Sequence, residues 1–452
     1  MFKQVKIAAL VASVAMLAAC GGGGGSGDVA SAAPAQAEAS AIPMGTVSST
    51  GVYQGPAQIR ARYGFNALPA STASNGSGQL IAIISSYNNP DLIENVATFS
   101  AKYGLPNCTV IKTAYVTSPT AYTTASVPRG SVGQNCTIQV VNLDSFGRPT
   151  TSVASSNSTS WNAESSMDAE WVHAMAPGAN ILIVQAPSPF VGALSYAAGY
   201  ASNVAKADVV SMSWGAAENS IQCVRRPMQP TVKYDPNCSD AATSSAYWNT
   251  LNANFAGPAT LVAASGDSAV LQWPSTMNTV LAVGGTAESG ATDIGWAGSG
   301  GGLSVSYKST PAQQAVTKQV QRSVPDVAYD AGTAVAVYIK PNAATGYPDT
   351  ACVALQGAAN CGWYGAGGTS AGAPQWAGIV AINNATRLAK RAPTIDFLNT
   401  MYTIAATPAS YSTAFVDITI GNTSLNTSKV GYDLVTGLGV PNASVLVGFM
   451  SN

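Results

Sequence analysis

Histidine and charged side chains are both scarce in this 452-residue chain. His173 is the single histidine, and charged residues make up 9% of the chain, against about a quarter in an average soluble protein. The formal net charge is −1 at pH 7 and no basic cluster stands out, which excludes the electrostatic footprint of a nucleic-acid-binding protein. Because so few groups titrate, acid adds few repelling charges, which favours a folded state at low pH.

Long apolar runs are also missing, apart from one near the N-terminus. About thirteen apolar residues, Ile7–Ala19, follow two lysines and are too few to span a membrane. The run ends in Leu-Ala-Ala-Cys20, which resembles a bacterial lipobox with Cys20 as the lipidated residue. We therefore expect a lipoprotein signal peptide over residues 1–19 and a flexible Gly/Ala/Ser/Pro-rich tether over residues 20–50. The protein is expected to be exported and anchored to the cell envelope, at the outer membrane or cell surface, through this lipid alone; cleavage without lipidation, which gives a secreted protein, is the alternative.

The cysteine count agrees with export. Of seven cysteines, six remain when Cys20 is set aside. An even number in an exported chain indicates disulfides, and six cysteines allow fifteen connectivities. We favour the pairs that are closest in sequence: Cys108–Cys136, Cys223–Cys238 and Cys352–Cys361.

Apolar, β-branched runs alternate with helical stretches along the rest of the chain. The expected buried strands are Leu80–Ile84, Ile181–Val184, Val209–Met212, Leu261–Ala264 and Val280–Val283. The expected helices are Asp91–Lys102, Glu164–Ala176, Leu194–Ala207 and Ala241–Ala256. Continuous apolar runs are typical of parallel strands buried on both faces. The alternation predicts an α/β domain over residues 51–452, with a doubly wound, mainly parallel sheet flanked by helices.

Ser370 is the most informative residue of the chain. It lies in Gly367-Gly368-Thr369-Ser370-Ala371-Gly372-Ala373-Pro374, which runs into an apolar helix. A turn of this kind presents a serine at a helix N-terminus, where it can serve either as a nucleophile or simply as a helix cap. A nucleophilic serine needs a base, which is usually a histidine oriented by an acid. The chain has one histidine to offer, so another base has to be considered.

The helix expected over Glu164–Ala176 carries the alternative base. Glu164 and Asp168 are four residues apart and share one helix face, where like charges are mildly destabilising. At about 100° per residue, His173 points about 140° away from Asp168 and about 180° away from Glu164. We therefore interpret His173 as a structural histidine. Taken alone, Glu164 and Asp168 also fit a solvated helix face.

These motifs together resemble the sedolisin family of serine-carboxyl peptidases, which have a subtilisin-like fold and mostly act in acid. The resemblance covers about residues 51–452 and rests on the order of its motifs. They are Glu164-x-x-x-Asp168 with Ala176-Pro177-Gly178-Ala179, Ser211-Met212-Ser213-Trp214-Gly215, Ser265-Gly266-Asp267-Ser268, Ala282-Val283-Gly284-Gly285-Thr286, Ser299-Gly300-Gly301-Gly302-Leu303-Ser304, Val324-Pro325-Asp326-Val327 and Gly368-Thr369-Ser370.

The resemblance implies Ser370 as the nucleophile, Glu164 as its general base and Asp168 as the residue that orients and tunes Glu164. Asp267 stands where subtilisin-like enzymes carry an asparagine that donates a hydrogen bond to the oxyanion, although alone it also fits a simple turn. A carboxyl group donates only when it is protonated. A carboxylate base still accepts protons near pH 4, where histidine is almost fully charged. The site is therefore predicted to work in acid. The implied substrate-flanking residues are Ser213, Trp214 and Gly215.

The C-terminal segment resembles the calcium site of the same family. Carboxylates and backbone carbonyls from glycine-rich turns suit a hard, oxygen-seeking cation such as Ca²⁺. The implied ligands of one structural ion are Asp417, Ile418, Lys429, Gly431 and Asp433, where Lys429 replaces a glycine that is common in the family. Aspartates that merely form turns are the alternative.

Two features depart from the family pattern. Domain-like sequence begins near Gly51, so we expect no long prosegment that assists folding and blocks the site. Some relatives also carry a glutamate after the first strand, where this chain has Ser85. We predict a monomeric, lipid-anchored acidic serine endopeptidase that acts on peptides or unfolded proteins. A catalytically silent peptide-binding protein and a serine hydrolase of non-peptide esters or amides are the alternatives.

Overall fold

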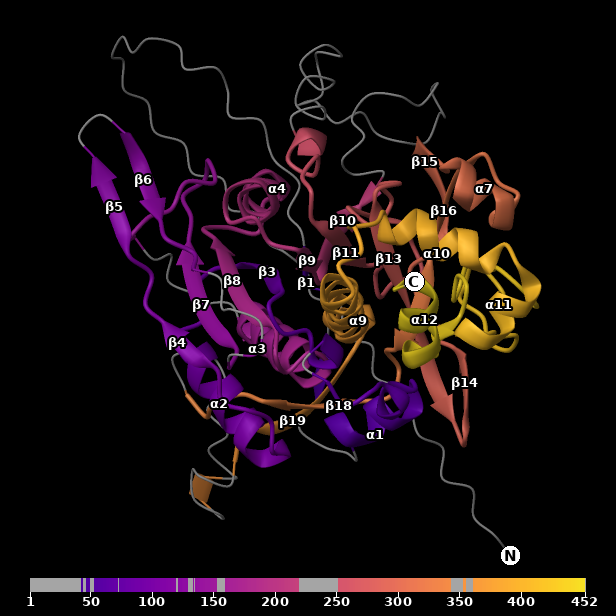
Figure 1. The fold of residues 1–452 in the computed structure, drawn as a ribbon, viewed down its shortest axis with the longest axis horizontal. Coiled ribbons are helices and arrows are strands. Elements are labelled where there is room, and N and C mark those ends of the chain that lie inside the picture. Colours follow the sequence, from indigo (N-terminus) through magenta and orange to yellow (C-terminus); the bar gives the residue numbers. More distant parts are fainter. Residues whose placement is uncertain are drawn as a thin grey trace, which may run out of the picture. The chain divides into compact units, whose positions relative to one another are not determined.

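Short apolar strands lie side by side at the centre of a nine-stranded sheet (Figure 1). The computed structural model describes residues 42–43, 46–48, 53–71, 73–118, 121–128, 133, 135–152, 159–218, 251–342, 353–354 and 361–451. The strands in spatial order are β14 (Thr292–Gly295), β13 (Val280–Ser289), β11 (Thr260–Ala264), β9 (Val209–Met212), β3 (Leu80–Ser86), β8 (Asn180–Ala186), β7 (Thr137–Asn142) and β4 (Thr109–Ile111), with β17 (Val327–Asp330) also paired to β13. All pairs are parallel except that of β13 with β14.

Helices cover both faces of this sheet, because each strand buries its two sets of alternating side chains. The face that carries Ile81 and Ile83 packs against α2 (Leu92–Tyr103), α3 (Thr159–Met175) and α9 (Thr369–Ala389). The opposite face, with Leu80 and Ala82, packs against α4 (Val191–Gly199). Figure 1 shows α4 and α3 on opposite sides of the strands. The predicted doubly wound, subtilisin-like α/β fold is confirmed.

The expected strands all form, and most differ from the expectation only at their ends. The helix expected over Leu194–Ala207 begins earlier, at Val191, and changes after Gly199 into a π-helix over Tyr200–Val204. The helix expected at the catalytic carboxylates also begins earlier, at Thr159. Most of the stretch expected as a helix over 241–256 lies outside the described residues.

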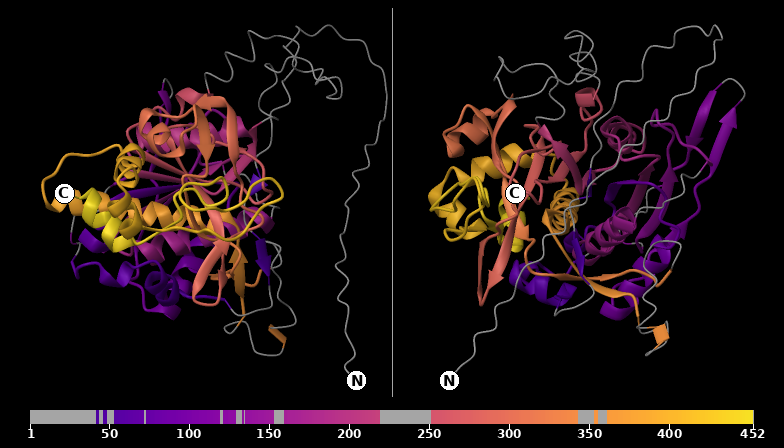
Figure 2. Two further views of the ribbon diagram at one scale, coloured as in Figure 1. Left: turned by 90° about the vertical axis from the view of Figure 1, so that its right-hand side faces the viewer. Right: turned by 180° about the vertical axis from the view of Figure 1, so that it is seen from behind.

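Smaller elements complete the domain. Further helices among the described residues are α1 (Pro56–Arg62), α7 (Pro311–Thr317), α10 (Phe397–Ala405), α11 (Pro408–Ala414) and α12 (Ala443–Met450), with 3₁₀ turns at Phe65–Ala67 and Ala73–Asn75. The smaller sheets contain β1 (Ile42–Pro43), β10 (Trp214–Ala217) and β12 (Gln272–Trp273); β18 (Val335–Tyr338), β19 (Trp363–Gly367) and β2 (Thr46–Ser48); β15 (Gly302–Lys308) and β16 (Gln321–Val324); β20 (Phe415–Val416) and β21 (Val440–Pro441); and β5 (Tyr115–Ser118) and β6 (Ala121–Ala125). Helices α10, α11 and α12 gather near β13 and β14, at the end of the sheet opposite to β4 (Figures 1 and 2).

One predicted disulfide is present. Cys108 and Cys136 are joined with an S–S distance of 2.06 Å. Cys361 is also disulfide-bonded, whereas its expected partner Cys352 lies outside the described residues. Cys223 and Cys238 lie outside them too, as do the expected signal peptide, Cys20 and most of the tether. Within the described ranges, none of the helices combines the length and the hydropathy that a bilayer crossing requires.

Candidate active site

Ser370 is the second residue of α9 and follows the strand β19 closely. Gly368, with a positive φ of 103°, is the N-cap that turns the chain from the strand into the helix, so Ser370 is not the cap. Pro374 lies inside the helix and lacks the N–H that normally bonds the carbonyl four residues earlier, which is that of Ser370. The Ser213 hydroxyl lies 3.3 Å from this carbonyl.

The two carboxylates of α3 face this serine from within the protein. Glu164 is 3% exposed and Asp168 is 1% exposed, so the alternative of a solvated helix face is wrong. The Ser370 hydroxyl is near Glu164 and lowers the pKa of that carboxyl group, against the larger opposite effect of burial. Ser370 Oγ also lies 3.3 Å from the Ser213 carbonyl. Ser213 Oγ in turn donates to Asp168 Oδ1 at 2.6 Å, so the two helices α3 and α9 meet at these side chains.

Burial and mutual repulsion govern the charge of the two carboxyl groups. Burial raises the pKa of Glu164 well above its usual range, and the neighbouring charge of Asp168 raises it further. Burial also raises the pKa of Asp168. Glu164 Oε1 has no hydrogen-bond partner in the part of the chain that the structure describes. Two buried carboxyl groups this close retain a shared proton, so one can act as a base while the other stays neutral.

Asp267 joins the site from the turn that follows β11. Its Oδ1 atom accepts two hydrogen bonds of 2.8 Å from Thr369, one from the backbone N–H and one from the hydroxyl. Burial raises the pKa of Asp267 to about 6, although these two bonds lower it. A protonated Asp267 keeps Oδ1 as the acceptor and has a second oxygen with which to donate a hydrogen bond to a reacting group.

His173 takes no part in this arrangement. It is fully buried, and its Nε2 lies 2.8 Å from the Pro106 carbonyl. Its Nδ1 lies 3.6 Å from Cys108 Sγ, so the imidazole packs against the Cys108–Cys136 disulfide. Burial lowers the pKa of His173, which keeps the ring neutral. Although this trio has the spacing of metal ligands, the bonded sulfurs carry no thiolate and cannot bind a metal as cysteines do.

The predicted substrate-flanking residues adjoin the serine. Ser213 contacts both Asp168 and Ser370, as described above, and β10 begins at Trp214. The Trp214 side chain is fully buried, and its ring centroid is 6.0 Å from that of Trp273. Trp214 can therefore contact a substrate only through its backbone.

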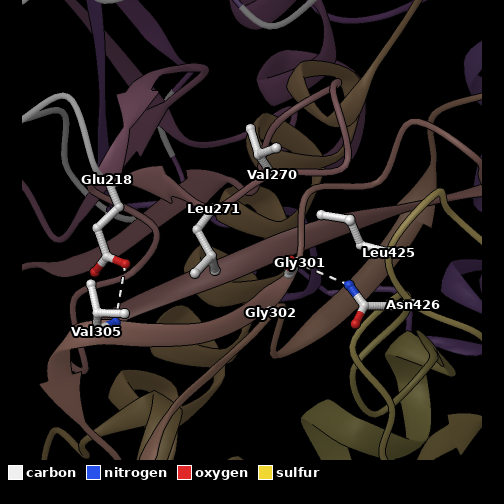
Figure 3. A pocket seen from close by; sticks show the side chains of 8 residues that line it. All are labelled: Glu218, Val270, Leu271, Gly301, Gly302, Val305, Leu425 and Asn426. Carbon is white, nitrogen blue, oxygen red and sulfur yellow. Dashed lines mark hydrogen bonds between the residues drawn. The ribbon is translucent and has the colours of Figure 1, made fainter. Parts of the chain in front are cut away.

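A cavity of about 290 Å³ lies next to β10 (Figure 3). Its lining residues are Glu218, Val270, Leu271, Gly301, Gly302, Val305, Leu425 and Asn426. Glu218 directly follows β10, and its carboxylate accepts a hydrogen bond from the Val305 N–H. The lining is apolar except for Glu218 and Asn426, and it includes none of the four predicted catalytic residues.

The predicted calcium ligands are close to one another in the structure. Asp417 Oδ2 accepts a hydrogen bond of 2.8 Å from the Gly431 N–H, and Asp433 Oδ2 accepts one of 3.1 Å from the Lys429 N–H. Asp433 Oδ1 accepts two further N–H groups, and burial raises the pKa of Asp433. Ile418 is buried beside Asp417. The half-buried Asp417 and the buried Asp433, with the neighbouring backbone carbonyls, supply the oxygen ligands that a hard cation prefers.

Sequence reasoning missed the structural role of Thr369. Its hydroxyl accepts a hydrogen bond of 3.0 Å from the Gly266 N–H and donates to Asp267, so it links the Asp267 turn to the first turn of α9. Gly266 adopts a positive φ of 117°, which this turn requires. The only sequence signal was the position of a hydroxyl residue directly before Ser370.

Comparisons with known proteins show the family to which the chain belongs. A family profile described as "Subtilase family" matches residues 147–394, more than half of the chain. The chain is 32% identical over 205 residues to tripeptidyl-peptidase sed4 of Aspergillus fumigatus, covering 38% of this chain and 32% of that protein. It is 39% identical over 90 residues to tripeptidyl-peptidase 1 of Dictyostelium discoideum, covering 18% of this chain and 14% of that protein. The matched regions thus span a third or less of these relatives.

A solved structure gives the fold comparison. Pseudomonas sedolisin, a serine-carboxyl proteinase solved with two molecules of pseudo-iodotyrostatin, matches with a TM-score of 0.60. The identity is 19%, and the match covers 89% of this chain and 98% of that chain. This similarity therefore extends over the full breadth of the sedolisin fold.

Proposed function

Because this chain belongs to the subtilase family, we propose that it is a serine-carboxyl endopeptidase that hydrolyses peptide bonds through an acyl-enzyme on Ser370. The observation that carries the proposal is that Ser213 connects Ser370 to the buried carboxylates Glu164 and Asp168 of α3, while the single histidine packs against a disulfide. Substrates are peptides or unfolded proteins, and the enzyme acts as a monomer.

In the first step Glu164 accepts the Ser370 proton while Ser370 Oγ attacks the peptide carbonyl. Asp168 keeps Glu164 in position and retains the proton that the buried pair shares. The protonated carboxyl group of Asp267 donates a hydrogen bond to the oxyanion of the tetrahedral intermediate. Glu164 then gives its proton to the leaving amine, and water hydrolyses the resulting ester by the reverse sequence.

The protonation states of the three carboxyl groups predict activity in acid. Asp267 donates only below its pKa of about 6, and Glu164 accepts only after the Glu164–Asp168 pair has lost one proton. Activity therefore falls on the alkaline side as Asp267 ionises. It falls on the acid side as Glu164 is protonated, at a pH raised above the usual glutamate range.

The test is cleavage of a denatured protein from pH 3 to pH 8 by the wild-type chain and by Ser370→Ala. Ser100→Ala is the matched control, because Ser100 is also buried but lies on α2, where its hydroxyl donates to the Val96 carbonyl. We expect acid cleavage that disappears in Ser370→Ala and persists in Ser100→Ala. A folded wild-type chain that cleaves no substrate contradicts the proposal and favours a peptide-binding protein; turnover of esters alone favours another hydrolase.

We further propose that one Ca²⁺ stabilises the C-terminal segment and that the protein is an exported lipoprotein. Asp417, Asp433 and the carbonyls of Ile418, Lys429 and Gly431 would hold the ion, whose positive charge offsets the repulsion between the two carboxylates. Lipidation of Cys20 would anchor the chain to the cell envelope. Cys20→Ser is expected to move the protein from the membrane fraction to the soluble fraction.

A further inference from the structure

Three polar side chains form a row across the central sheet, on the face that α3 covers. β3 lies between β8 and β9 (Figure 1), and Ser85 of β3 is directly opposite Gln185 of β8. On the other side of β3, Ile83 is opposite Ser211 of β9. Two residues further along the chain, Ser85 and Ser213 are therefore at the same level. The row consists of Gln185, Ser85 and Ser213.

The row points towards the carboxylates of α3. Alternate residues of a strand point to opposite faces of its sheet. The isoleucines two residues before Ser85 and Gln185 belong to the core on the side of α3, so Ser85 and Gln185 point to that side as well. Ser213 fixes the position of the row, because its hydroxyl donates to Asp168 Oδ1 at 2.6 Å. Ser85 and Gln185 thus follow directly after a side chain that contacts Asp168.

Ser85 and Gln185 are buried polar groups without hydrogen-bond partners. Ser85 is 1% exposed and Gln185 is 2% exposed. Among the residues that the structure describes, Ser85 Oγ and both polar atoms of the Gln185 amide have no partner, and the same holds for Glu164 Oε1. Buried polar groups of this kind are usually satisfied by an ordered water molecule that makes about three hydrogen bonds. Three unpaired atoms on two adjacent side chains therefore indicate a water-binding site.

The proposed mechanism needs the proton of the carboxyl pair to stay on Asp168. Burial and the charge of Asp168 both raise the pKa of Glu164, which favours a proton on Glu164 and would leave Ser370 without a base. Asp267 is the third titratable group that acts on the pair, and its charge raises the pKa of Glu164 further. A hydrogen-bond acceptor beside Asp168 has the opposite effect, because it stabilises the protonated form of that carboxyl group.

We propose that Gln185 and Ser85 bind a buried water molecule that accepts the proton of Asp168 in a hydrogen bond. The water donates in turn to the side-chain oxygen of Gln185, and Ser85 Oγ is its third partner. Because Ser213 bonds Asp168 Oδ1, the water takes the other oxygen, Oδ2. The shared proton is thereby held on Asp168, and Glu164 is left ionised to act as the base.

Gln185 is accordingly a positioning residue, because it acts through the water and Asp168 and not on the substrate. Its effect should therefore appear in kcat and not in KM. The inference rests on the proposed peptidase function, in which Glu164 is the base of Ser370. It also predicts a feature that exists without any substrate, which is an ordered water molecule between Gln185 and Asp168.

Kinetics on one peptide substrate in acid test the role of Gln185. Gln185→Met nearly keeps the length of the side chain and removes both polar atoms. Its kcat should fall about tenfold, which corresponds to one hydrogen bond, with KM unchanged. Gln185→Glu keeps an oxygen at the same position, and a buried carboxyl group stays neutral in acid, so this variant should retain most of the wild-type kcat. Each value is normalised to the folded fraction of the protein.

Gln139→Met is the matched control. Gln139 is also a buried glutamine and lies on the neighbouring strand β7, but on the face that carries Val141, away from α3. Its amide already has partners, since it donates to the Thr113 hydroxyl at 3.1 Å and to the Ser126 carbonyl at 2.7 Å. We expect this variant to lose stability and to keep kcat. A fall in kcat equal to that of Gln185→Met would mean that the loss of any buried amide has this effect, and it overturns the inference.

A crystal structure of the wild-type protein tests the water directly. We expect an ordered water molecule within about 3.2 Å of the Gln185 side chain, of Ser85 Oγ and of an Asp168 oxygen. The water should be absent from crystals of Gln185→Met. A structure without this water, such as one in which Gln185 bonds Asp168 directly, overturns the inference even where kcat falls.

The outcomes separate this inference from the proposed function. Wild-type cleavage that depends on Ser370, combined with a Gln185→Met variant as active as the wild type, overturns the role of Gln185 and leaves the peptidase function standing. A wild-type chain that cleaves no substrate contradicts the proposed function and with it the role of Gln185 in the reaction. The crystal structure then still decides whether the water is bound.

Discussion

The replacement Asp267→Asn tests the role of Asp267 through the pH profile. An asparagine keeps an acceptor oxygen for the two Thr369 hydrogen bonds, and its neutral amide donates at every pH. The wild-type carboxyl group donates only while protonated, below its pKa of about 6. The substitution therefore removes one ionisation from the mechanism and preserves the hydrogen-bonding geometry.

The expected magnitude follows from that pKa. At pH 8, two units above it, about one Asp267 in a hundred is protonated, so wild-type kcat/KM should fall about 100-fold from its acid plateau. Asp267→Asn should lose this alkaline decline and resemble the wild type in acid. The decline of kcat/KM on the acid side should remain in both proteins, because it results from protonation of the Glu164–Asp168 pair.

The assay is kcat/KM on one peptide substrate from pH 3 to pH 8, with Asp267→Ala as the control. The alanine variant lacks an oxyanion donor at every pH and should lose about 100- to 1000-fold in kcat even in acid. If Asp267→Asn retains the wild-type alkaline limb, another group controls it and the proposed role of Asp267 is wrong.

Three further predictions concern the surroundings of the site. Ser213→Ala removes the hydroxyl that contacts Asp168, and we expect kcat to fall about tenfold with little change in KM, measured on a short peptide. Arg322→Met leaves the fully buried Asp326 without its ion-pair partner and should lower the free energy of unfolding by about 3–5 kcal/mol, measured by chemical denaturation. Chelating Ca²⁺ should lower Tm in the wild type but not in Asp417→Asn, whose Tm should be low already; equal shifts in both proteins would place any ion elsewhere.

The central strands could be predicted from sequence because they are short, apolar and bounded by turns. β3 and β8, for example, are buried along their whole length, so their sequences carry little besides apolar residues. β17 was missed because it is four residues long and contains Tyr329 and Asp330, whose burial depends on tertiary neighbours. The change from α-helix to π-helix after Gly199 could not be predicted either, since the residues on both sides continue one helical pattern.

The candidate site was predictable where helical periodicity applies. The four-residue spacing of Glu164 and Asp168 placed them together, and the same rule placed His173 on another side of α3. The network around Thr369 was not predictable, because it joins residues 102 positions apart. Nor does sequence reveal the raised pKa of Asp267, which results from burial.

The central claim is that a glutamate, and not the single histidine, activates Ser370. The most direct measurement compares kcat for Glu164→Gln and His173→Gln on one peptide substrate in acid, normalised to the folded fraction of each protein. Glutamine matches glutamate in shape but cannot accept the serine proton, so we expect Glu164→Gln to lose activity by about 100-fold or more. His173→Gln should retain near-wild-type kcat, because its ring packs against the disulfide. An active Glu164→Gln, or an inactive but folded His173→Gln, would contradict the account.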